Sequence, residues 1–422
     1  MPDPLNDSYY RATANAWETQ PEFEGDAEYD VAVIGGGFTG LSAALACAEK
    51  GLKVALFEAR TIGFGASGRN GGQLIPGLRW SMREIDAEFG RERAQAIFDL
   101  AYGAVERVES RIARHDIQCD LKCGHLEAAY KPSHFEGMQR DAEFLSREFG
   151  WDSIDVVRPP DMARHIEGGN YNGGIYDRKG GHFHPLNYVL GLAKAALAAG
   201  VAIYENTPVT IMYEMDGIEL FAGKGIVEAA TAIVATDTWI GEVHGDLASY
   251  TVPIMNYNIA TAPMADADQL LPSDAAVADS RFVLNYFRLS ADKRIIFGGG
   301  EKYVQTPPSN IGAFVRKHML EVFPSLANTP IDYAWGGAVG VTANRLPHMG
   351  RKGNVFYAHG FSGHGALITT LAGELMAEAV VGTMERFDVF ASLPHSRFPG
   401  GKWLARPLAT LGLLYYAMRD RL

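Results

Sequence analysis

The stretch Val-Ala-Val-Ile-Gly-Gly-Gly-Phe-Thr-Gly, residues 31–40, decides the fold. Its four apolar residues are typical of a buried parallel strand, and Gly35, Gly37 and Gly40 follow the spacing G-x-G-x-x-G. In this spacing the first glycine permits a tight turn, the second lets the backbone approach a pyrophosphate, and the third lets a helix pack on its strand. A helix over residues 41–50 would direct free N–H groups at the anion. The stretch therefore predicts a dinucleotide site.

A second apolar strand, residues 53–57, supports this interpretation. It runs into Glu58, which lies about 20 residues beyond the glycine turn, where a carboxylate binds the cofactor ribose. A strand, a glycine turn, a helix and a second strand in this order are typical of a dinucleotide-binding unit.

Composition narrows the classes of protein that the chain can represent. With 422 residues it exceeds what a single hydrophobic core usually organises, so we expect two domains. Apolar residues make up 47% and charged residues 21%, which is typical of a globular protein. The net charge is −12 and no basic stripe is present, which argues against a nucleic-acid partner.

The cysteines and the apolar runs indicate the compartment. Cys47, Cys119 and Cys123 are too few for a disulfide framework and favour a reducing environment. Cys119 and Cys123 are spaced C-x-x-x-C, but only His115 and His125 lie near them, so we expect free thiols and no metal site. No signal peptide and no run approaching the ~20 apolar residues of a membrane span is found, so we expect a cytoplasmic protein.

Two further loops, far apart in the chain, are unusually rich in glycine. One reads Gly-Ala-Ser-Gly-Arg-Asn-Gly-Gly-Gln (residues 65–73), and the other His-Gly-Phe-Ser-Gly-His-Gly (residues 359–365). Long polar loops of this kind usually hold a ligand.

The remaining pattern alternates helices and strands. Periodicity predicts helices over 81–115, 134–149, 186–199, 310–322 and 366–381, and a turn at 180–185. It predicts strands over 121–129, 201–204, 230–235, 281–289, 293–297 and 355–358, and a meander of short strands over 209–228.

These motifs together resemble the flavin-dependent amine and amino-acid oxidases, and within them the branch of the gamma-glutamylputrescine oxidoreductases. The matching segments are 31–40 with Glu58, 65–73, 285–300, 341–350, 359–365 and 398–422. The resemblance implies an α/β fold, with a Rossmann-like FAD-binding domain and a discontinuous substrate domain built on a mainly antiparallel sheet. It also implies oxidation of a primary or secondary amine, as in polyamine catabolism. Hydride would pass to flavin N5, the imine would give an aldehyde or ketone, and O2 would be reduced to H2O2.

The expected domains alternate along the chain. An N-terminal arm is expected over 1–28, the FAD-binding domain over 29–85, 155–245 and 330–397, the substrate domain over 86–154 and 246–329, and an amphipathic tail over 398–422.

The two extra loops support FAD independently of the resemblance, because a nicotinamide cofactor has no evident use for them and FAD needs more backbone around it. We expect residues 69–73 beside the flavin and 235–239 near the pyrophosphate. A helix after residue 365 would stabilise the charge that collects on the flavin's pyrimidine oxygen. The expected cofactor-binding residues are Gly35, Gly37, Phe38, Thr39, Gly40, Glu58, Ala59, Arg60, Gly65, Ala66, Ser67, Arg69, Asn70, Gly71, Gly72, Gln73, Leu74, Val209, Ala235, Thr236, Trp239, Gly337, Gly360, Phe361, Ser362, Gly363, His364 and Gly365.

On the substrate side, a dry aromatic pocket would favour the neutral amine that hydride transfer requires. The aromatic candidates for its lining are Tyr257, Tyr286, Phe287 and Trp335; each has core packing as its alternative. His359 and His364 could each bond the flavin or the substrate, or act as a structural cap.

Arg288 is the most informative residue of the substrate side. Relatives that oxidise amino acids carry at this place an arginine that clamps a carboxylate, and we expect Arg288, Tyr286 and His364 to act in catalysis. The alternative for Arg288 is an ion pair with Asp292 or Glu301.

The resemblance to sarcosine oxidases fails at one informative point. That branch carries a lysine for the substrate carboxylate two residues beyond its Gly-His-Gly, where this chain has Ala366 and Leu367. This favours an amine whose carboxylate is distant, as in a gamma-glutamyl polyamine, or an amine with no carboxylate. No cysteine lies beyond Cys123, so FAD is expected to be non-covalent.

Three questions stay open from the sequence. The tail over 398–422 could lie on a membrane, but an amphipathic stripe normally faces its own protein, so we expect it to pack. Electrons could pass to a protein or quinone acceptor instead of O2. The chain could also bind flavin without redox turnover.

Overall fold

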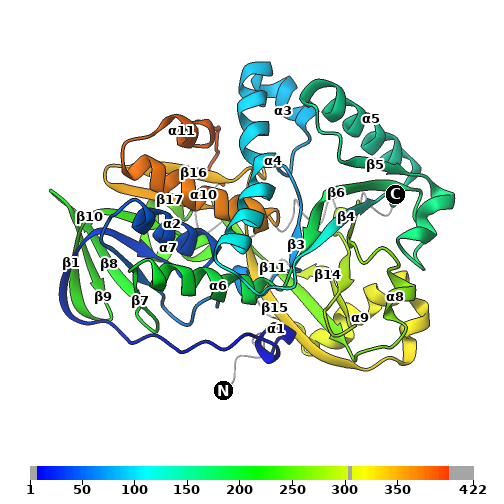
Figure 1. Ribbon diagram of the computed structural model, residues 1–422, viewed down its shortest axis with the longest axis horizontal. Coiled ribbons are helices and arrows are strands. Elements are labelled where there is room, and N and C mark those ends of the chain that lie inside the picture. Colours follow the sequence, from blue (N-terminus) through cyan, green and yellow to red (C-terminus); the bar gives the residue numbers. More distant parts are fainter. Residues whose placement is uncertain (1–6, 303–306, 399–422) are drawn as a thin grey trace.

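Two β-sheets organise the residues that the computed structural model describes, which are 7–302 and 307–398 (Figure 1). The expected α/β fold is confirmed. The tail expected over 398–422 lies outside the described residues from 399 onward.

The first sheet is built around the strand that carries the glycine turn. Its order is β16-β17-β10-β1-β2-β7, with β8 and β9 continuing from β10. β1 pairs in parallel with β2 and β10, so that Ile34 stands beside Phe57 and Val234. The strands of this sheet are β1 (Glu24–Ile34), β2 (Val54–Phe57), β7 (Ala202–Tyr204), β8 (Val209–Glu214), β9 (Ile218–Ala222), β10 (Lys224–Val234), β16 (His348–Lys352) and β17 (Val355–His359).

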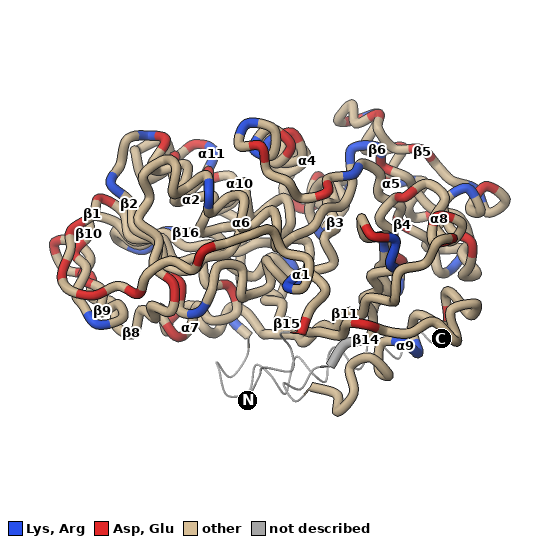
Figure 2. Tube along the Cα trace, turned by 60° about the horizontal axis from the view of Figure 1, so that its bottom comes forward, with Lys and Arg blue, Asp and Glu red and all other residues tan. Residues whose placement is uncertain are grey.

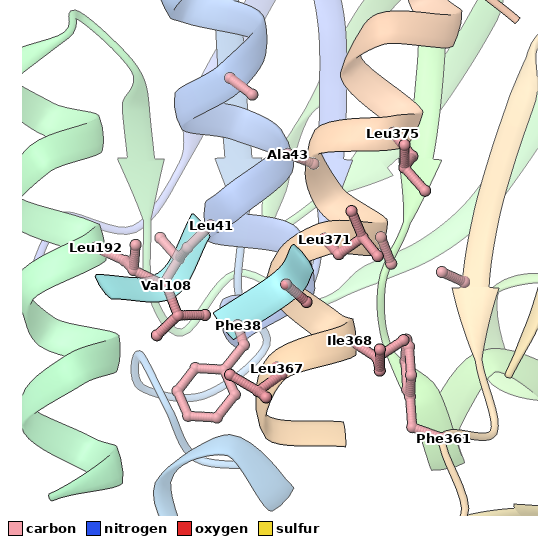
Figure 3. Close-up of a cluster of buried hydrophobic side chains, with 14 of the residues drawn as sticks. Phe38, Leu41, Ala43, Val108, Leu192, Phe361, Leu367, Ile368, Leu371 and Leu375 are labelled. Carbon is pink, nitrogen blue, oxygen red and sulfur yellow. The ribbon is translucent and has the colours of Figure 1, made fainter. Parts of the chain in front are cut away.

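The helices that follow its strands pack through small and branched apolar residues. In Figure 3, Leu41 of α2 (Phe38–Glu49) lies among Leu371 of α10 (Gly365–Val380), Leu192 of α6 (Pro185–Ala198) and Val108 of α4 (Arg91–Arg114). α10 crosses α2 closely at Gly373, where a Cβ would lie 2.5 Å from the Thr39 carbonyl oxygen. The helices predicted over 41–50, 186–199 and 366–381 are therefore confirmed.

The second sheet is mainly antiparallel, as expected. Its order is β15-β11-β14-β13-β12-β4-β6-β3, with β5 on β6, and β4 with β12 is its parallel pair. α9 (Ile311–Val322) covers one face through a separate apolar core. The strands are β3 (Gln73–Leu74), β4 (Lys122–Ala128), β5 (Ile154–Val157), β6 (Gly174–His182), β11 (Thr251–Thr261), β12 (Ala276–Asp279), β13 (Tyr286–Leu289), β14 (Ile295–Lys302) and β15 (Ile331–Thr342).

The helix predicted over 81–115 is two helices. They meet at Gly90, whose φ of +80° ends the first helix. The other helices are α1 (Tyr9–Ala12), α3 (Met82–Phe89), α5 (Pro132–Phe149), α7 (Ile240–Val243), α8 (Ala267–Leu270) and α11 (Glu385–Ala391).

Strand pairing corrects several expected boundaries. Residues 174–182 and 331–342 were expected in the FAD-binding domain, but they form β6 and β15 of the second sheet. Consequently the turn expected at 180–185 is wrong, because Gly181 and His182 pair with β3. The strand expected over 281–289 is shorter, starting at Tyr286. α4, expected in the substrate domain, packs against α10.

From residue 7 onward the N-terminal segment is anchored by aromatic residues, and β1 begins within the range 1–28 expected for the arm. Residues 24–28 already belong to β1 and pair with β10. Tyr9 and Tyr10 of α1 are buried, and the Tyr9 hydroxyl donates to Asp292 at 2.8 Å. Further along, the buried carboxylate of Glu205 accepts from the Trp17 indole N–H at 3.0 Å. The arm thus contacts both sheets.

Charge is distributed in both signs over the described chain. Figure 2 shows Lys and Arg interspersed with Asp and Glu along the trace. Among the described helices, none is both long and apolar enough to cross a membrane.

Tyr10→Ala should destabilise the protein, because the fully buried ring contacts Trp335 and the hydroxyl accepts from Arg288. We expect the free energy of unfolding to fall by about 3–5 kcal/mol. Tyr10→Phe, which removes only the hydroxyl, should cost about 1–2 kcal/mol. Urea unfolding followed by circular dichroism measures both. Tyr213→Ala, at a half-exposed position on β8, is the matched control. Equal effects at Tyr10 and Tyr213 would show that the arm contributes nothing to the core.

Candidate functional site

The glycine turn joins β1 to α2 at the carboxyl edge of the first sheet. Gly35 has a φ of +109°, and a Cβ there would lie 2.6 Å from the Ala235 carbonyl oxygen. A Cβ at Gly40 would lie 1.9 Å from the Gly35 oxygen, so the first turn of α2 sits directly on the end of β1. Phe38 N–H donates to the Ser67 hydroxyl at 2.9 Å. The remaining N–H groups of this first turn have no acceptor within the helix and are available to a phosphate.

Glu58 lies beside this turn, as the spacing predicts. One carboxylate oxygen accepts from Gly36 N–H at 2.7 Å and the other from Arg60 N–H at 2.8 Å. Burial raises the pKa of Glu58, and the two backbone donors oppose the rise. Each oxygen keeps a second lone pair for a ribose hydroxyl. Ala59 and Arg60 are exposed here, and the chain leading to Val209 pairs with Glu58 through Thr207 N–H at 2.8 Å.

The second glycine loop connects the two sheets. It leaves the first sheet after β2, forms a 3-10 turn at Ala66–Gly68 and enters the second sheet as β3. The Arg69 guanidinium donates to Phe64 O at 2.6 Å and Gly336 O at 3.2 Å. The Arg69 carbonyl accepts from the Trp335 indole N–H at 2.9 Å.

The side chains around Arg69 hold the loop in place. Asn70 accepts from Gly72 N–H at 2.8 Å and donates to the Ala66 and Ser67 carbonyls, and Gln73 donates to Val277 O at 2.8 Å. Sequence-predicted residues that are far apart in the chain meet here. A Cβ at Gly65 would contact Trp239 at 3.4 Å, and one at Gly337 would contact Arg69 at 3.5 Å.

Asp237 lies in the segment 235–239 that was expected near the pyrophosphate, but it was not among the expected cofactor-binding residues, although a polar residue directly after a buried strand is a recognisable signal. Its carboxylate accepts from Gly360 N–H at 2.8 Å and from Gly340 N–H at 3.2 Å. It therefore ties the end of β10 to β15 and to the loop before α10. Burial raises the pKa of Asp237 and the backbone donors oppose the rise. Its neighbours Thr236 and Thr238 have buried hydroxyls without a partner in the described chain.

The loop over 359–365 contains two histidines with different surroundings. His359 is fully buried, and its Nε2 lies 2.9 Å from Nδ1 of His348, whose ring in turn packs on His395. The expectation that His359 binds substrate is therefore wrong, because its ring is enclosed among other histidines. Burial lowers the pKa of His348 to about 3 and that of His395 to about 4, so this cluster is neutral at pH 7.

His364 stands at the start of α10, with Nε2 buried and without a partner in the described chain. Burial lowers its pKa to about 3, so the ring is neutral at pH 7. Ser362, two residues before it, holds the loop to β15 through its N–H, which donates to Gly340 O at 2.9 Å.

One face of the second sheet lies over the loop of residues 65–73. Tyr286 is on this face, because a Cβ at Gly71 would meet its ring at 2.5 Å, and its hydroxyl donates to Asn256. Asn258 is on the same face and donates to Arg69 O at 3.4 Å.

Three other candidates for the substrate lining are placed differently from the expectation. Tyr257 and Phe287 point to the opposite face: Tyr257 packs edge-on against Phe314 of α9 at 5.7 Å, and Phe287 lies in the same apolar core. Trp335 is on the correct face but is fully buried beneath Tyr10 of the arm. Each is a core residue, because side chains alternate between the faces of a strand and the arm covers part of one face.

Arg288 shares the face of Tyr286 but is already engaged. Its guanidinium donates to Gly71 O at 2.7 Å, to Leu289 O at 3.0 Å and to the Tyr10 hydroxyl at 3.1 Å. The cavity beside it has a volume of about 10 Å³, which is room for about one water. The carboxylate clamp is therefore corrected to a structural contact between arm, loop and sheet. The alternative ion pair with Asp292 is also corrected, because Asp292 pairs with Arg294; the side chain of Glu301, the other alternative, lies outside what the structure describes.

The residues present fit FAD. One edge of the first sheet brings together glycine backbones from three loops, the first turn of α2, and the hydroxyls of Thr236 and Thr238, which have no partner in the described chain. The second sheet continues from the loop that would run beside the flavin. Glu58 is positioned for the ribose, and residues 365–380 supply a second helix N-terminus.

Asp237→Asn should weaken FAD binding, because an amide cannot accept two N–H groups with both of its heavy atoms. We expect the dissociation constant to rise about tenfold to hundredfold. Titration of the apoprotein with FAD, followed by flavin fluorescence, measures this. Asp216→Asn, in the exposed turn between β8 and β9, is the matched control. An unchanged dissociation constant would show that the Asp237 contacts do not shape the cofactor site.

Arg288→Lys should lower stability by about 1–3 kcal/mol, because a lysine cannot serve three acceptors in a fixed plane. It should also lower kcat/KM, and the factor should be the same for amines with a carboxylate as for amines without one. Both classes are measured side by side on the same preparation. A loss of kcat/KM only for carboxylated amines would instead support the role of Arg288 in binding a substrate carboxylate.

With this geometry described, comparison with known proteins identifies the family. The family model described as FAD dependent oxidoreductase (DAO) matches residues 30–379. The gamma-glutamylputrescine oxidoreductase of Escherichia coli (strain K12) is 37% identical over 419 residues, covering 98% of each chain. Glycine oxidase of Bacillus licheniformis is 25% identical and covers 84% of this chain and 93% of its own.

Solved structures show the same fold. Glycine oxidase from Geobacillus kaustophilus superposes with a TM-score of 0.71 at 21% identity, covering 84% of this chain and 95% of its own. L-proline dehydrogenase from P. horikoshii gives a TM-score of 0.71, covering 87% and 98%. With three glycine loops, a parallel sheet and a mainly antiparallel second sheet in this arrangement, the chain belongs to the DAO family of FAD-dependent oxidoreductases.

Proposed function

We propose that this enzyme oxidises an amine of the gamma-glutamylputrescine type at its terminal CH–NH2 group, using non-covalent FAD. The observation that carries the proposal is the position of Tyr286, whose ring packs on Gly71 of the flavin loop while its hydroxyl bonds Asn256. A polar group on an aromatic ring is thereby held at the junction of the two sheets. The relative that is 37% identical over 98% of both chains is named for this substrate.

FAD, when bound, supplies the acceptor for the hydride that leaves the carbon beside the nitrogen. The protein must bring the amine to the junction in its neutral form, because an ammonium has no lone pair to assist the loss of hydride. Tyr286 and Asn256 offer a hydroxyl and an amide to orient the nitrogen without adding charge.

His364 is suited to the same task as a neutral partner. A ring with a pKa of about 3 is a weak base at pH 7, so we assign it a hydrogen-bonding role and not that of a general base. The absence of a cation at Ala366 and Leu367 agrees with a substrate whose carboxylate lies far from the reacting carbon, since Leu367 is part of the apolar core.

The electron acceptor is proposed to be O2, with H2O2 as product; transfer to a protein or quinone is the second candidate. Flavin binding without turnover is the third. The proposed domain division places the FAD site on the first sheet with α2, α6 and α10, and the substrate site on the second sheet.

Anaerobic mixing of the FAD-loaded enzyme with single amines tests the proposal. We expect gamma-glutamylputrescine to bleach the visible flavin absorption, and glycine, sarcosine and D-alanine to bleach it at least about tenfold more slowly at equal concentration. Readmission of air should restore the absorption with one H2O2 per flavin. If the flavin absorption returned only on addition of a quinone, the enzyme would be a dehydrogenase and not an oxidase. If no amine bleached the flavin, the proposal would be overturned. Tyr286→Phe should slow bleaching about tenfold without changing the FAD content.

A further inference from the structure

The flavin-facing side of the second sheet carries one continuous row of paired residues. Strand register places them side by side across six strands, and paired residues on adjacent strands have their side chains on the same face. The row runs Glu127 (β4), Ala278 (β12), Tyr286 (β13), Gly298 (β14), Asn258 (β11) and Trp335 (β15). The Arg69 carbonyl accepts from Trp335 and Asn258 of this row, and Gly71 lies against the ring of Tyr286.

Glu127 is the residue of this row that the proposed function does not use. Its neighbours along the strand, Leu126 and Ala128, lie in the apolar core under α9, so its own side chain is on the opposite face with Tyr286. It is half-buried, and it forms no hydrogen bond or ion pair with any residue in the described ranges. Its oxygens are not among the fully buried polar atoms of the described chain that lack a partner, so they are accessible to a ligand.

The spacing along the row matches the length of an amino-acyl diamine. Two strand spacings, across β12, separate the Cα atoms of Tyr286 and Glu127, which is about 10 Å. Between them stands Ala278, whose side chain is a single methyl group. In an extended gamma-glutamyl diamine, eight bonds separate the carbon that is oxidised from the α-carbon, also on the order of 10 Å. The Tyr286 hydroxyl reaches toward Asn256 of β11, away from Glu127, so the match holds for a substrate whose reacting carbon lies above the first atoms of the Tyr286 side chain. Its distant ammonium group would then lie at Glu127.

Arg79 provides the complementary charge. It is exposed, makes no ion pair with another residue of the described chain, and acts electrostatically on both Glu127 and His364. Burial raises the pKa of Glu127, and the charge of Arg79 opposes the rise. His125, next on the same face of β4, is neutral because burial lowers its pKa to about 4, so it does not compete as a cation.

We propose that Glu127 and Arg79 recognise the remote zwitterionic end of the substrate, Glu127 accepting from its α-ammonium group and Arg79 donating to its α-carboxylate. This assignment rests on the proposed function and names the part of the substrate that determines specificity. It accounts for a carboxylate that faces inward without a partner and for an unpaired arginine beside it. It also replaces Arg288 as the site of carboxylate recognition.

Four amides of putrescine test the two contacts separately: the gamma-glutamyl amide, the glutaryl amide without the ammonium, the 4-aminobutyryl amide without the carboxylate, and the butyryl amide with neither. Glu127→Gln should raise KM about tenfold to hundredfold for the two amides that carry the ammonium and leave the other two unchanged. Arg79→Gln should raise KM about twofold to fivefold for the two that carry the carboxylate. kcat should change little in every case.

Binding of a compound that cannot be oxidised separates this proposal from the proposed function. The gamma-glutamyl amide of butylamine has no reactive amine, and calorimetry should show it binding the wild-type holoenzyme but about tenfold more weakly to Glu127→Gln. Glu136→Gln, at an exposed position on α5, is the control, and FAD content and unfolding midpoint verify that each variant is folded.

The outcomes are distinct. If the wild type oxidises none of the four amides but Glu127→Gln weakens binding in calorimetry, the proposed function is overturned and the recognition by Glu127 is supported. If the amides are oxidised but Glu127→Gln weakens all four equally, or weakens none, the recognition by Glu127 is overturned.

Discussion

The hydrogen bonds of Arg69 hold the two sheets in register with each other. Its guanidinium donates to the backbone of β15, and its carbonyl accepts from side chains of β11 and β15. The chain that carries it runs from the end of β2 into β3 within 16 residues, 58–73. A short segment bonded at both ends leaves little freedom between the layers. In the proposed site, a cofactor bound along this segment would meet the first sheet through its phosphates and the second through its reactive ring.

Around this link the proposed cofactor site is built from backbone groups and helix N-termini. Asp237 is partly buried, and two backbone N–H donors that stabilise its carboxylate also join the loop of residues 359–365 to β15. α2 and α10 meet through Gly373 and branched apolar residues, so their N-termini are fixed by core packing. Packed helices thus position the N-termini that are proposed to face the cofactor's anionic groups.

Several residues whose side chains are suited to catalysis or binding have structural roles instead. Arg288 supports the Gly71 carbonyl and the arm, His359 belongs to a neutral histidine cluster, and Trp335 is covered by Tyr10. Each occupies a position where its chemistry would suit a substrate, yet neighbouring segments enclose it. Glu127 shows the opposite case. An acidic residue in a short strand gives no signal in the sequence, and only the register across β12 and β13 places it on the face of Tyr286.

The sequence by itself determined the parts that depend on local chemistry. A G-x-G-x-x-G turn after a strand, the carboxylate of Glu58 and two more glycine loops predict FAD and the first sheet, because tight turns and close backbone approach require glycine wherever they occur. Only the tertiary structure decided the faces and partners. Whether Tyr257 or Tyr286 meets a ligand depends on strand alternation, on a bulge between Asn256 and Asn258, and on which face α9 covers. β6 and β15 join the second sheet because their backbone partners come from distant segments, and such pairing leaves no trace in either strand alone.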